Sequence, residues 1–141
     1  MRKRRRALSL VLALVLCMGM LALPVGAASD EAVNAAEELY ARGLFKGTGT
    51  DSDGLPIFDL DRTPTRNEAV TMLVRLLGEE SEALSGTWQM PFTDVADWAK
   101  PYVGYAYAYG LTNGTSATTY SGSTTIDATQ YLTFVLRALG Y

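Results

Sequence analysis

The sequence contains no histidine and a single cysteine, Cys17, among its 141 residues. Histidine and cysteine supply most general bases, thiol nucleophiles and zinc ligands in enzymes. No serine stands in a Gly-x-Ser-x-Gly turn either. The carboxylates of Asp59, Asp61 and Glu68 could converge, but so short a chain offers little cleft for glycoside hydrolysis. We therefore expect no enzymatic activity, no cofactor and no metal site.

The N-terminus is typical of an export signal. Basic residues fill positions 2–6, an apolar stretch follows over 7–23, and small residues occupy positions 25–27. We expect cleavage after Ala27 or Ala28, so residues 1–27 form a signal peptide. An uncleaved membrane anchor is the alternative, because the apolar stretch approaches the length of a short transmembrane helix.

The remaining chain has few basic residues. Five of the twelve lie in positions 2–6, whereas all fifteen acidic residues follow position 27, so residues 28–141 carry a net charge of −8. Such a surface repels nucleic acid and anionic lipid. We expect no nucleic-acid partner, and contact with a membrane only during export.

The sequence repeats itself. Residues 39–78 align with residues 106–140 after one five-residue gap, which indicates two copies of one unit. The identical pairs are Tyr40 and Tyr107, Gly43 and Gly110, Leu44 and Leu111, Gly47 and Gly114, Thr71 and Thr133, Arg75 and Arg137, and Gly78 and Gly140.

Each copy is predicted to form a helix, a loop and a second helix. The first helix of copy one should run from Asp30 to Arg42, with Ser29 as its N-cap and a glycine at its end. Its counterpart should follow Asp97 as N-cap and hold Pro101 in its first turn. Apolar residues at helical spacing predict the second helices, before Gly78 and Gly140: Ala69, Met72, Leu73, Leu76 and Leu77, and Tyr131, Val135, Leu136 and Leu139.

Two capping boxes are expected where the second helices begin. Thr65 and Glu68 have the required spacing in copy one, and Asp127 and Gln130 have it in copy two. The acidic loop around Asp51 resembles a calcium-binding loop in composition, but its acidic residues do not have the spacing of EF-hand ligands. An Asx turn is the better interpretation.

Four short motifs carry a family resemblance. They are Phe92-Thr93-Asp94-Val95, Trp98-Ala99, Gly110-Leu111-Thr112-Asn113-Gly114, and Thr65-Arg66-Asn67-Glu68. Together they resemble the S-layer homology family. That resemblance implies non-covalent anchoring to secondary cell-wall polysaccharide, often through pyruvyl groups, by a body of three lobes.

This chain departs from the family pattern in three respects. Copy one lacks the Phe-x-Asp-Val and Trp-Ala elements, copy two has Asp127-Ala128-Thr129-Gln130 in place of the Thr-Arg-Ala-Glu box, and the sequence contains two copies rather than three. The fold class we expect is all-α, with two helix-loop-helix repeats packed as one small domain. The repeats span residues 28–90, N-terminally incomplete, and 91–141.

Arg66 is the strongest candidate for a binding residue. Copy two has Ala128 at this position and keeps its cap, so helix formation does not require the arginine, and Arg66→Ala should leave the fold nearly untouched. A guanidinium binds a carboxylate through two parallel hydrogen bonds. A solvated arginine at a helix start is the alternative.

The resemblance also implies a polysaccharide site at Asp94, Trp98, Gly110 and Gly114, beside Arg66. A turn or cap role for Asp94 and a packing role for Trp98 are the alternatives. Tyrosines 102, 105 and 109 share one helical face, where packing in the core is favoured over contact with sugar rings.

Two functions remain open. The first is a cell-wall-associated extracellular module that binds polysaccharide. The second is an assembly module, which completes a three-lobed body with other copies or with other repeat-bearing proteins. A fragment of a longer anchor remains a third interpretation.

Overall fold

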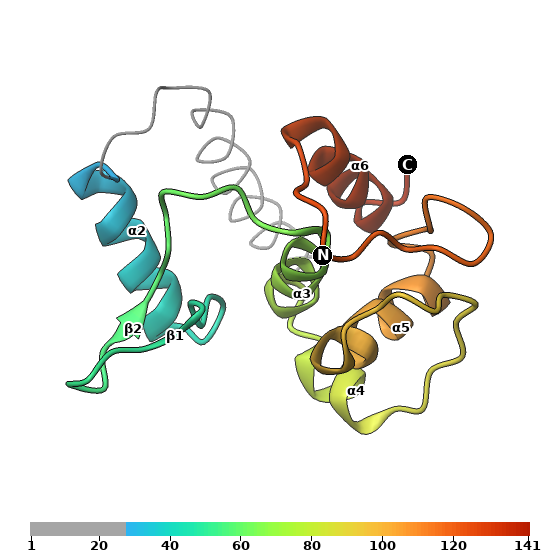
Figure 1. Ribbon diagram of the computed structural model, residues 1–141, viewed down its shortest axis with the longest axis horizontal. Coiled ribbons are helices and arrows are strands. Elements are labelled where there is room, and N and C mark those ends of the chain that lie inside the picture. The colour runs from blue at the N-terminus through green and yellow to red at the C-terminus, as the bar shows by residue number, and fades with distance from the viewer. Residues whose placement is uncertain (1–27) are drawn as a thin grey trace.

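The structure, a computed structural model, describes residues 28–141 and is largely helical (Figure 1). The predicted signal peptide lies outside the described residues. In chain order the elements are α2 (Asp30–Ala41), β1 (Gly49–Thr50), β2 (Pro56–Ile57), α3 (Arg66–Leu76), α4 (Glu80–Ser85), the 3-10 turn η1 (Asp97–Ala99), α5 (Lys100–Ala108) and α6 (Ala128–Ala138). Within residues 28–141, no helix has the length and apolar character needed to cross a membrane.

The first part of the chain forms what we call the N-terminal lobe, residues 28–60, with α2 and a small hairpin (Figure 1). Ser29 caps α2 by accepting a hydrogen bond from the backbone N–H of Ala32, and Gly43 ends the helix with a φ of 70°. Both features were predicted. The ring of Phe58, directly after β2, stacks on Phe45 with centroids 5.4 Å apart and meets Tyr40 of α2 edge-on at 5.9 Å.

The hairpin corrects the all-α prediction. Strands β1 and β2 pair antiparallel, with Gly49 opposite Ile57. The expected Asx turn closes the hairpin, because the Asp51 carboxylate accepts the backbone N–H groups of Asp53 and Leu55 at 2.9 Å each. Such a turn brings its flanking residues side by side, and this local pairing was not visible in the helical periodicity on which the prediction relied.

Helices α3 to α6 form a second part, the helical body, residues 65–141, around one hydrophobic core. Helix α3 lies at its centre and packs against α5 and α6. The largest fully buried side chains include Leu73 of α3, Tyr131 and Phe134 of α6, and Tyr120 from the preceding loop. Helix α4, which the sequence analysis did not predict, packs against α5 and α3.

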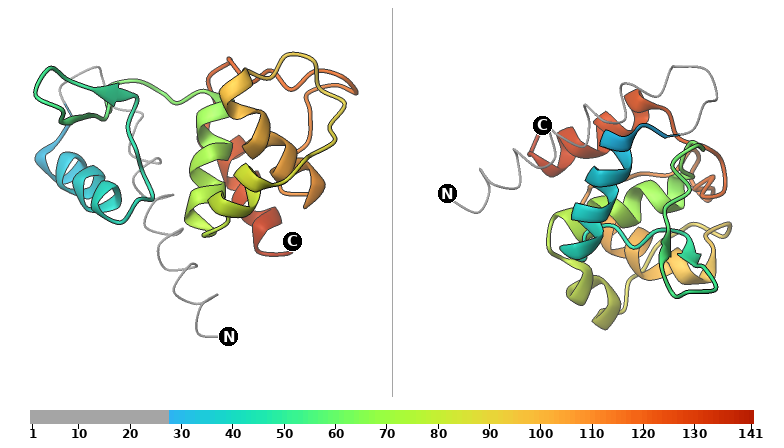
Figure 2. Two further views of the ribbon diagram at one scale, coloured as in Figure 1. Left: turned by 90° about the horizontal axis from the view of Figure 1, so that it is seen from below. Right: turned by 90° about the vertical axis from the view of Figure 1, so that its left-hand side faces the viewer.

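The two copies do not pack as two self-contained units. Helix α3 of copy one packs against both helices of copy two, whereas α2 lies apart from the helical body in Figure 1 and in the left view of Figure 2. Residue sizes explain the difference: α5 buries Tyr102 and Val103, where α2 has Ala35 and Ala36 at the same offset. Less apolar area means a weaker drive to join the core. The predicted arrangement of two packed repeats is therefore not observed in that form.

The start of α5 also differs from the prediction. Asp97 does not cap the helix but opens η1, and its carboxylate forms an ion pair with Lys100. The 3-10 turn supplies the entry into the helix, so a side-chain cap is absent at this end of α5. Pro101 lies in the first turn, and Gly110 ends the helix with a φ of 70°, as expected.

Candidate functional site

Both second helices begin with a capping box. In copy one the backbone N–H of Thr65 donates to Glu68 Oε2 at 2.7 Å, while Thr65 Oγ1 accepts from the Glu68 backbone N–H. In copy two Asp127 Oδ1 accepts from the backbone N–H of Gln130 at 2.7 Å. These four side chains satisfy N–H groups that the helices cannot satisfy internally. Their role is therefore to stabilise the first turns of α3 and α6.

Arg66 lies inside the helical body, with 9% of its surface exposed. Its guanidinium lies over the rings of Tyr120, at 5.0 Å, and Phe134, at 4.9 Å. It donates a hydrogen bond to the backbone carbonyl of Asn113 at 2.9 Å, while its Nε is buried without a partner among the described residues. These contacts assign Arg66 a packing role between α3, α6 and the loop before α6. Comparison of the two copies did not reveal this role.

Asp94 organises the same loop from the other side. Its two carboxylate oxygens accept the backbone N–H groups of Tyr120 and Ser121 at 2.7 and 2.8 Å. The hydrogen bond from Tyr120, helped by that from Ser121, holds the pKa of Asp94 below its usual range. Asp94 and Arg66 thus meet at Tyr120, one through its backbone and one through its ring.

The two glycines of the predicted site serve the backbone. Gly110 adopts a left-handed φ of 70° at the end of α5. Gly114 is confined, because a Cβ there would come within 2.5 Å of the Ser116 carbonyl and 2.6 Å of the Thr119 carbonyl. Both positions require glycine for conformation or for space.

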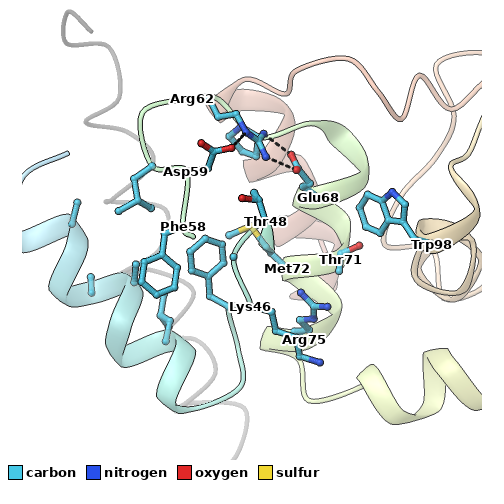
Figure 3. Close-up of a pocket in the computed structure, with 18 residues that line it drawn as sticks. Lys46, Thr48, Phe58, Asp59, Arg62, Glu68, Thr71, Met72, Arg75 and Trp98 are labelled. Carbon is cyan, nitrogen blue, oxygen red and sulfur yellow. Dashed lines mark hydrogen bonds and ion pairs between the residues drawn. The ribbon is translucent and has the colours of Figure 1, made fainter. Parts of the chain in front are cut away.

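A concave surface lies between the N-terminal lobe and α3. This cleft has a volume of about 570 Å³. Its walls come from α2, the Phe45 and Phe58 pair and the exposed side of α3, and it extends across α3 to Trp98 (Figure 3). The structure therefore places Trp98 at this cleft, and it places Arg66 outside the residues that line it.

Trp98 is the predicted site residue that lines the cleft. Its side chain is 54% exposed, and it stands at the 3-10 turn before α5. An indole face on a polar surface can stack against the apolar face of a sugar ring, as aromatic side chains do with other flat ligands. Of the two interpretations weighed for Trp98, its exposure favours the groove over the core.

The cleft is locally more basic than the chain. Lys46, Arg62 and Arg75 line it, against the carboxylates of Asp59 and Glu68. Arg62 donates to both of these carboxylates, to Asp59 at 2.8 Å and to Glu68 at 2.6 Å (Figure 3). The hydrogen bond from Arg62 lowers the pKa of Glu68 to about 2. With Glu80, which pairs with Lys46 and Arg75, the three cations of the cleft are balanced by three carboxylates, in contrast to the net −8 of residues 28–141.

Glu80 connects the lobe to the helical body. It accepts hydrogen bonds from Lys46 of the lobe at 2.9 Å, Arg75 of α3 at 2.9 Å and the Tyr102 hydroxyl at 2.7 Å. Burial raises the pKa of Glu80, but the hydrogen bonds from Lys46, Tyr102 and Arg75 outweigh it and lower the pKa to about 2. This carboxylate orients two cations at one end of the cleft.

The three tyrosines of α5 divide between core and surface. Tyr102 and Tyr105 are 6% and 5% exposed, as core residues should be, whereas Tyr109 is 54% exposed. Burial raises the pKa of Tyr105 to about 12. Tyr109 donates its hydroxyl hydrogen to Glu82 and lies outside the residues that line the cleft.

Sequence analysis missed the cations of the cleft. A signal existed for Arg75, which is identical to Arg137 in the comparison of the copies. No pattern pointed to Lys46 or Arg62, because their convergence depends on where the lobe lies relative to α3. Among the described residues, no group of three or more acidic side chains is arranged to hold a metal ion.

Comparison with known proteins agrees with the motifs at Asp94 and Trp98. Residues 91–127 match the family model of the S-layer homology domain. The chain carries an S-layer homology domain. The matched segment contains η1, α5, the loop that Asp94 organises and the N-cap of α6. No solved structure matches the chain.

Curated relatives extend the similarity beyond that segment. The chain is 32% identical over 111 residues to a cell surface protein of Thermoanaerobacter kivui. It is 30% identical over 107 residues to a surface layer protein of Brevibacillus choshinensis and to a middle cell wall protein of Brevibacillus brevis. These alignments cover 77%, 74% and 74% of the chain, but only 14%, 9% and 10% of the relatives. The chain thus corresponds to a small part of much longer proteins.

Proposed function

We propose that this chain is a non-catalytic module of the bacterial cell surface that binds cell-wall polysaccharide in the cleft between the N-terminal lobe and α3. Support comes from the S-layer homology domain at residues 91–127 and from relatives described as cell surface, surface layer and cell wall proteins. The observation that carries the proposal is the exposed indole of Trp98 at the cleft that also holds Lys46, Arg62 and Arg75.

The chemistry of the cleft suits an acidic sugar, for example one with a pyruvyl carboxylate. Trp98 provides a face for the ring, while Lys46 and Arg75 provide positive charge that Glu80 orients. In this proposal Arg66 and Asp94 act as positioning residues, because both hold the loop around Tyr120 rather than facing the cleft. Gly110 and Gly114 shape the turn between α5 and that loop.

A sedimentation assay with purified wall sacculi tests the proposal. Trp98→Ala should reduce the bound fraction, corresponding to about a tenfold weaker affinity, since loss of an aromatic contact costs on the order of 1–2 kcal/mol. Tyr109→Ala is the matched control, because Tyr109 has the same 54% exposure but lies outside the cleft. Sacculi stripped of polysaccharide by hydrofluoric acid should bind neither the parent nor the two variants. Equal binding of the Trp98 variant and the parent would show that the site is elsewhere.

An assembly module is the second candidate function. It is favoured by the apolar residues that α6 exposes, Leu132, Leu136 and Leu139, at 40%, 41% and 43%. Their spacing places them on one side of the helix, where a protein partner could cover them.

A further inference from the structure

We propose that this exposed side of α6 is the docking surface for α2 of a second copy of the same chain. The inference rests on the assembly function and names its partner. It follows from comparing what covers each helix in copy one with what covers its equivalent in copy two.

Equivalent sides of α3 and α6 have different surroundings. The α3 stripe consists of Val70, Val74 and Leu77, and the α6 stripe consists of Leu132, Leu136 and Leu139, each 62 positions later. Val70 and Val74 are fully buried, and Leu77 packs against the core. The α6 stripe is at least 40% exposed at each position. One side of the repeated helix is therefore covered in copy one and bare in copy two.

The helix that α3 has and α6 lacks is a first helix of the repeat. Helix α5 packs against α3, and the side formed by Ala99 at the end of η1 with Val103 and Ala106 of α5 is fully buried. The corresponding residues 67 positions earlier are Ala32, Ala36 and Leu39, which we call the α2 stripe. The α2 stripe keeps the apolar character of its α5 equivalent. In this chain the stripe forms a wall of the cleft, with Ala36 buried and Ala32 and Leu39 half-buried, and α2 stands apart from the other helices (Figure 1).

Each chain thus carries one donor side, on α2, and one acceptor side, on α6. The contact between α5 and α3 within the chain is the pattern for this docking. If α2 of one copy packs on α6 of another in the same way, the α2 stripe and the α6 stripe cover each other. The N-terminal lobe joins α3 through the single segment 61–64, so docking requires the lobe to turn about this segment. That movement breaks the ion pair between Lys46 and Glu80.

Charge supports α2 as the partner of α6. Helix α2 contains four acidic residues and no basic one, whereas Arg137 is the single charged residue within α6. Two α2 helices would repel each other, while α2 and α6 attract. A head-to-tail contact of this kind gives rings or open chains, according to the rotation between neighbours. One helix against another buries less than a standard interface, so we expect weak association that depends on protein concentration.

The first test is sedimentation velocity. The protein is expressed from the full sequence in a Gram-positive host and is purified in the form that the host secretes or retains. The double variant Leu132→Glu, Leu136→Glu should self-associate at least tenfold more weakly than the parent. Ala117→Glu adds a negative charge at an exposed site outside α6 and should leave association unchanged. Circular dichroism checks that each variant remains folded. A parent that stays monomeric at 500 μM overturns the proposal, as does a double variant that associates like the parent.

Cross-linking tests which surface occupies α6. In a Cys17→Ser background, Leu39→Cys and Leu136→Cys are prepared as separate proteins and treated with a short bismaleimide. We expect covalent dimers when the two are mixed and none from either alone. Dimers from Leu136→Cys alone would show that α6 docks on α6, and dimers from Leu39→Cys alone that α2 docks on α2; both overturn the proposal. Binding of the same proteins to sacculi is measured separately, so failure of assembly is distinguished from failure of polysaccharide binding.

Discussion

Arg66 and Ala128 show how one position can serve different purposes in two copies of a repeat. Both stand directly after a working helix cap, which makes the arginine look dispensable for folding. In the structure Arg66 reaches across to Tyr120 and Phe134 of copy two and ties the Asn113 carbonyl to α3. The arginine thus stabilises the contact between the copies.

Arg66→Ala should therefore lower the free energy of unfolding by about 2–3 kcal/mol. Loss of the hydrogen bond to the Asn113 carbonyl and of two partly desolvated cation–π contacts supports this magnitude. Chemical denaturation measures it, with Lys100→Ala as a surface control in the same body. An unchanged midpoint for Arg66→Ala would return Arg66 to the candidates for direct ligand contact.

Asp94→Asn should also destabilise the protein, by about 1–2 kcal/mol. The amide keeps one acceptor oxygen, but it loses the charge and the second acceptor that hold the N–H groups of Tyr120 and Ser121. Asp97→Asn makes the same change three residues later on an exposed side chain and should leave the thermal midpoint unchanged. Equal midpoints for the two variants would contradict the role assigned to Asp94.

At the scale of the elements, local signals at the helix ends agree with the structure. Ser29 and the left-handed glycines at 43, 78, 110 and 140 bound the helices where the sequence indicated. These features depend on hydrogen bonds and dihedral angles within a few residues. The end of α5 that differed, at Asp97, is the one where the incoming chain forms a 3-10 turn instead of a cap.

Thr65→Ala tests the capping box of α3, and it should cost on the order of 1 kcal/mol of stability. Asp127→Ala should have a similar effect at α6, because its carboxylate makes the equivalent bond. Neither residue faces the cleft directly, so the affinity for sacculi should change less than in Trp98→Ala. Thermal unfolding and sedimentation with sacculi are measured on the same preparations. A cap variant that binds less well than Trp98→Ala while remaining equally stable would contradict this division of roles.

At the scale of the whole molecule, two carboxylates join parts that the sequence separates. Glu68 forms an ion pair with Arg62 of the segment before α3. Glu80 forms ion pairs with Lys46 of the N-terminal lobe and with Arg75 of α3. The pKa of each carboxyl is lowered to about 2. Because the folded pKa lies below the unfolded value, their stabilisation is present in full above about pH 5.

We expect stability to fall as the pH drops from about 5 towards 2, where these two carboxylates take up protons. Glu80→Gln should be less stable than the parent at pH 7, by about 1 kcal/mol after allowance for solvent screening, and the two should converge near pH 2. Thermal midpoints at unit steps between pH 7 and pH 2 measure this difference. A constant difference across that range would show that Glu80 acts through packing and not through its charge.

The sequence by itself determined the local features: four main helices, the caps of α2, α3 and α6, the glycine stops, the repeat, and the motif around Asp94 and Trp98. Each of these is set by side chains within a few positions of one another, or by direct comparison of residues. Sequence periodicity also predicted which sides of α3 and α6 are apolar, but not which neighbour would cover them.

Only the tertiary structure decided which helices meet. Helix α3 has partners in copy two because α5 offers Tyr102 and Val103 where α2 offers alanines, and this difference acts between residues far apart in the chain. The same long-range choice buries Arg66, forms the cleft beside Trp98 and leaves the leucines of α6 exposed. Burial and convergence depend on the position of the whole lobe, which no local pattern encodes.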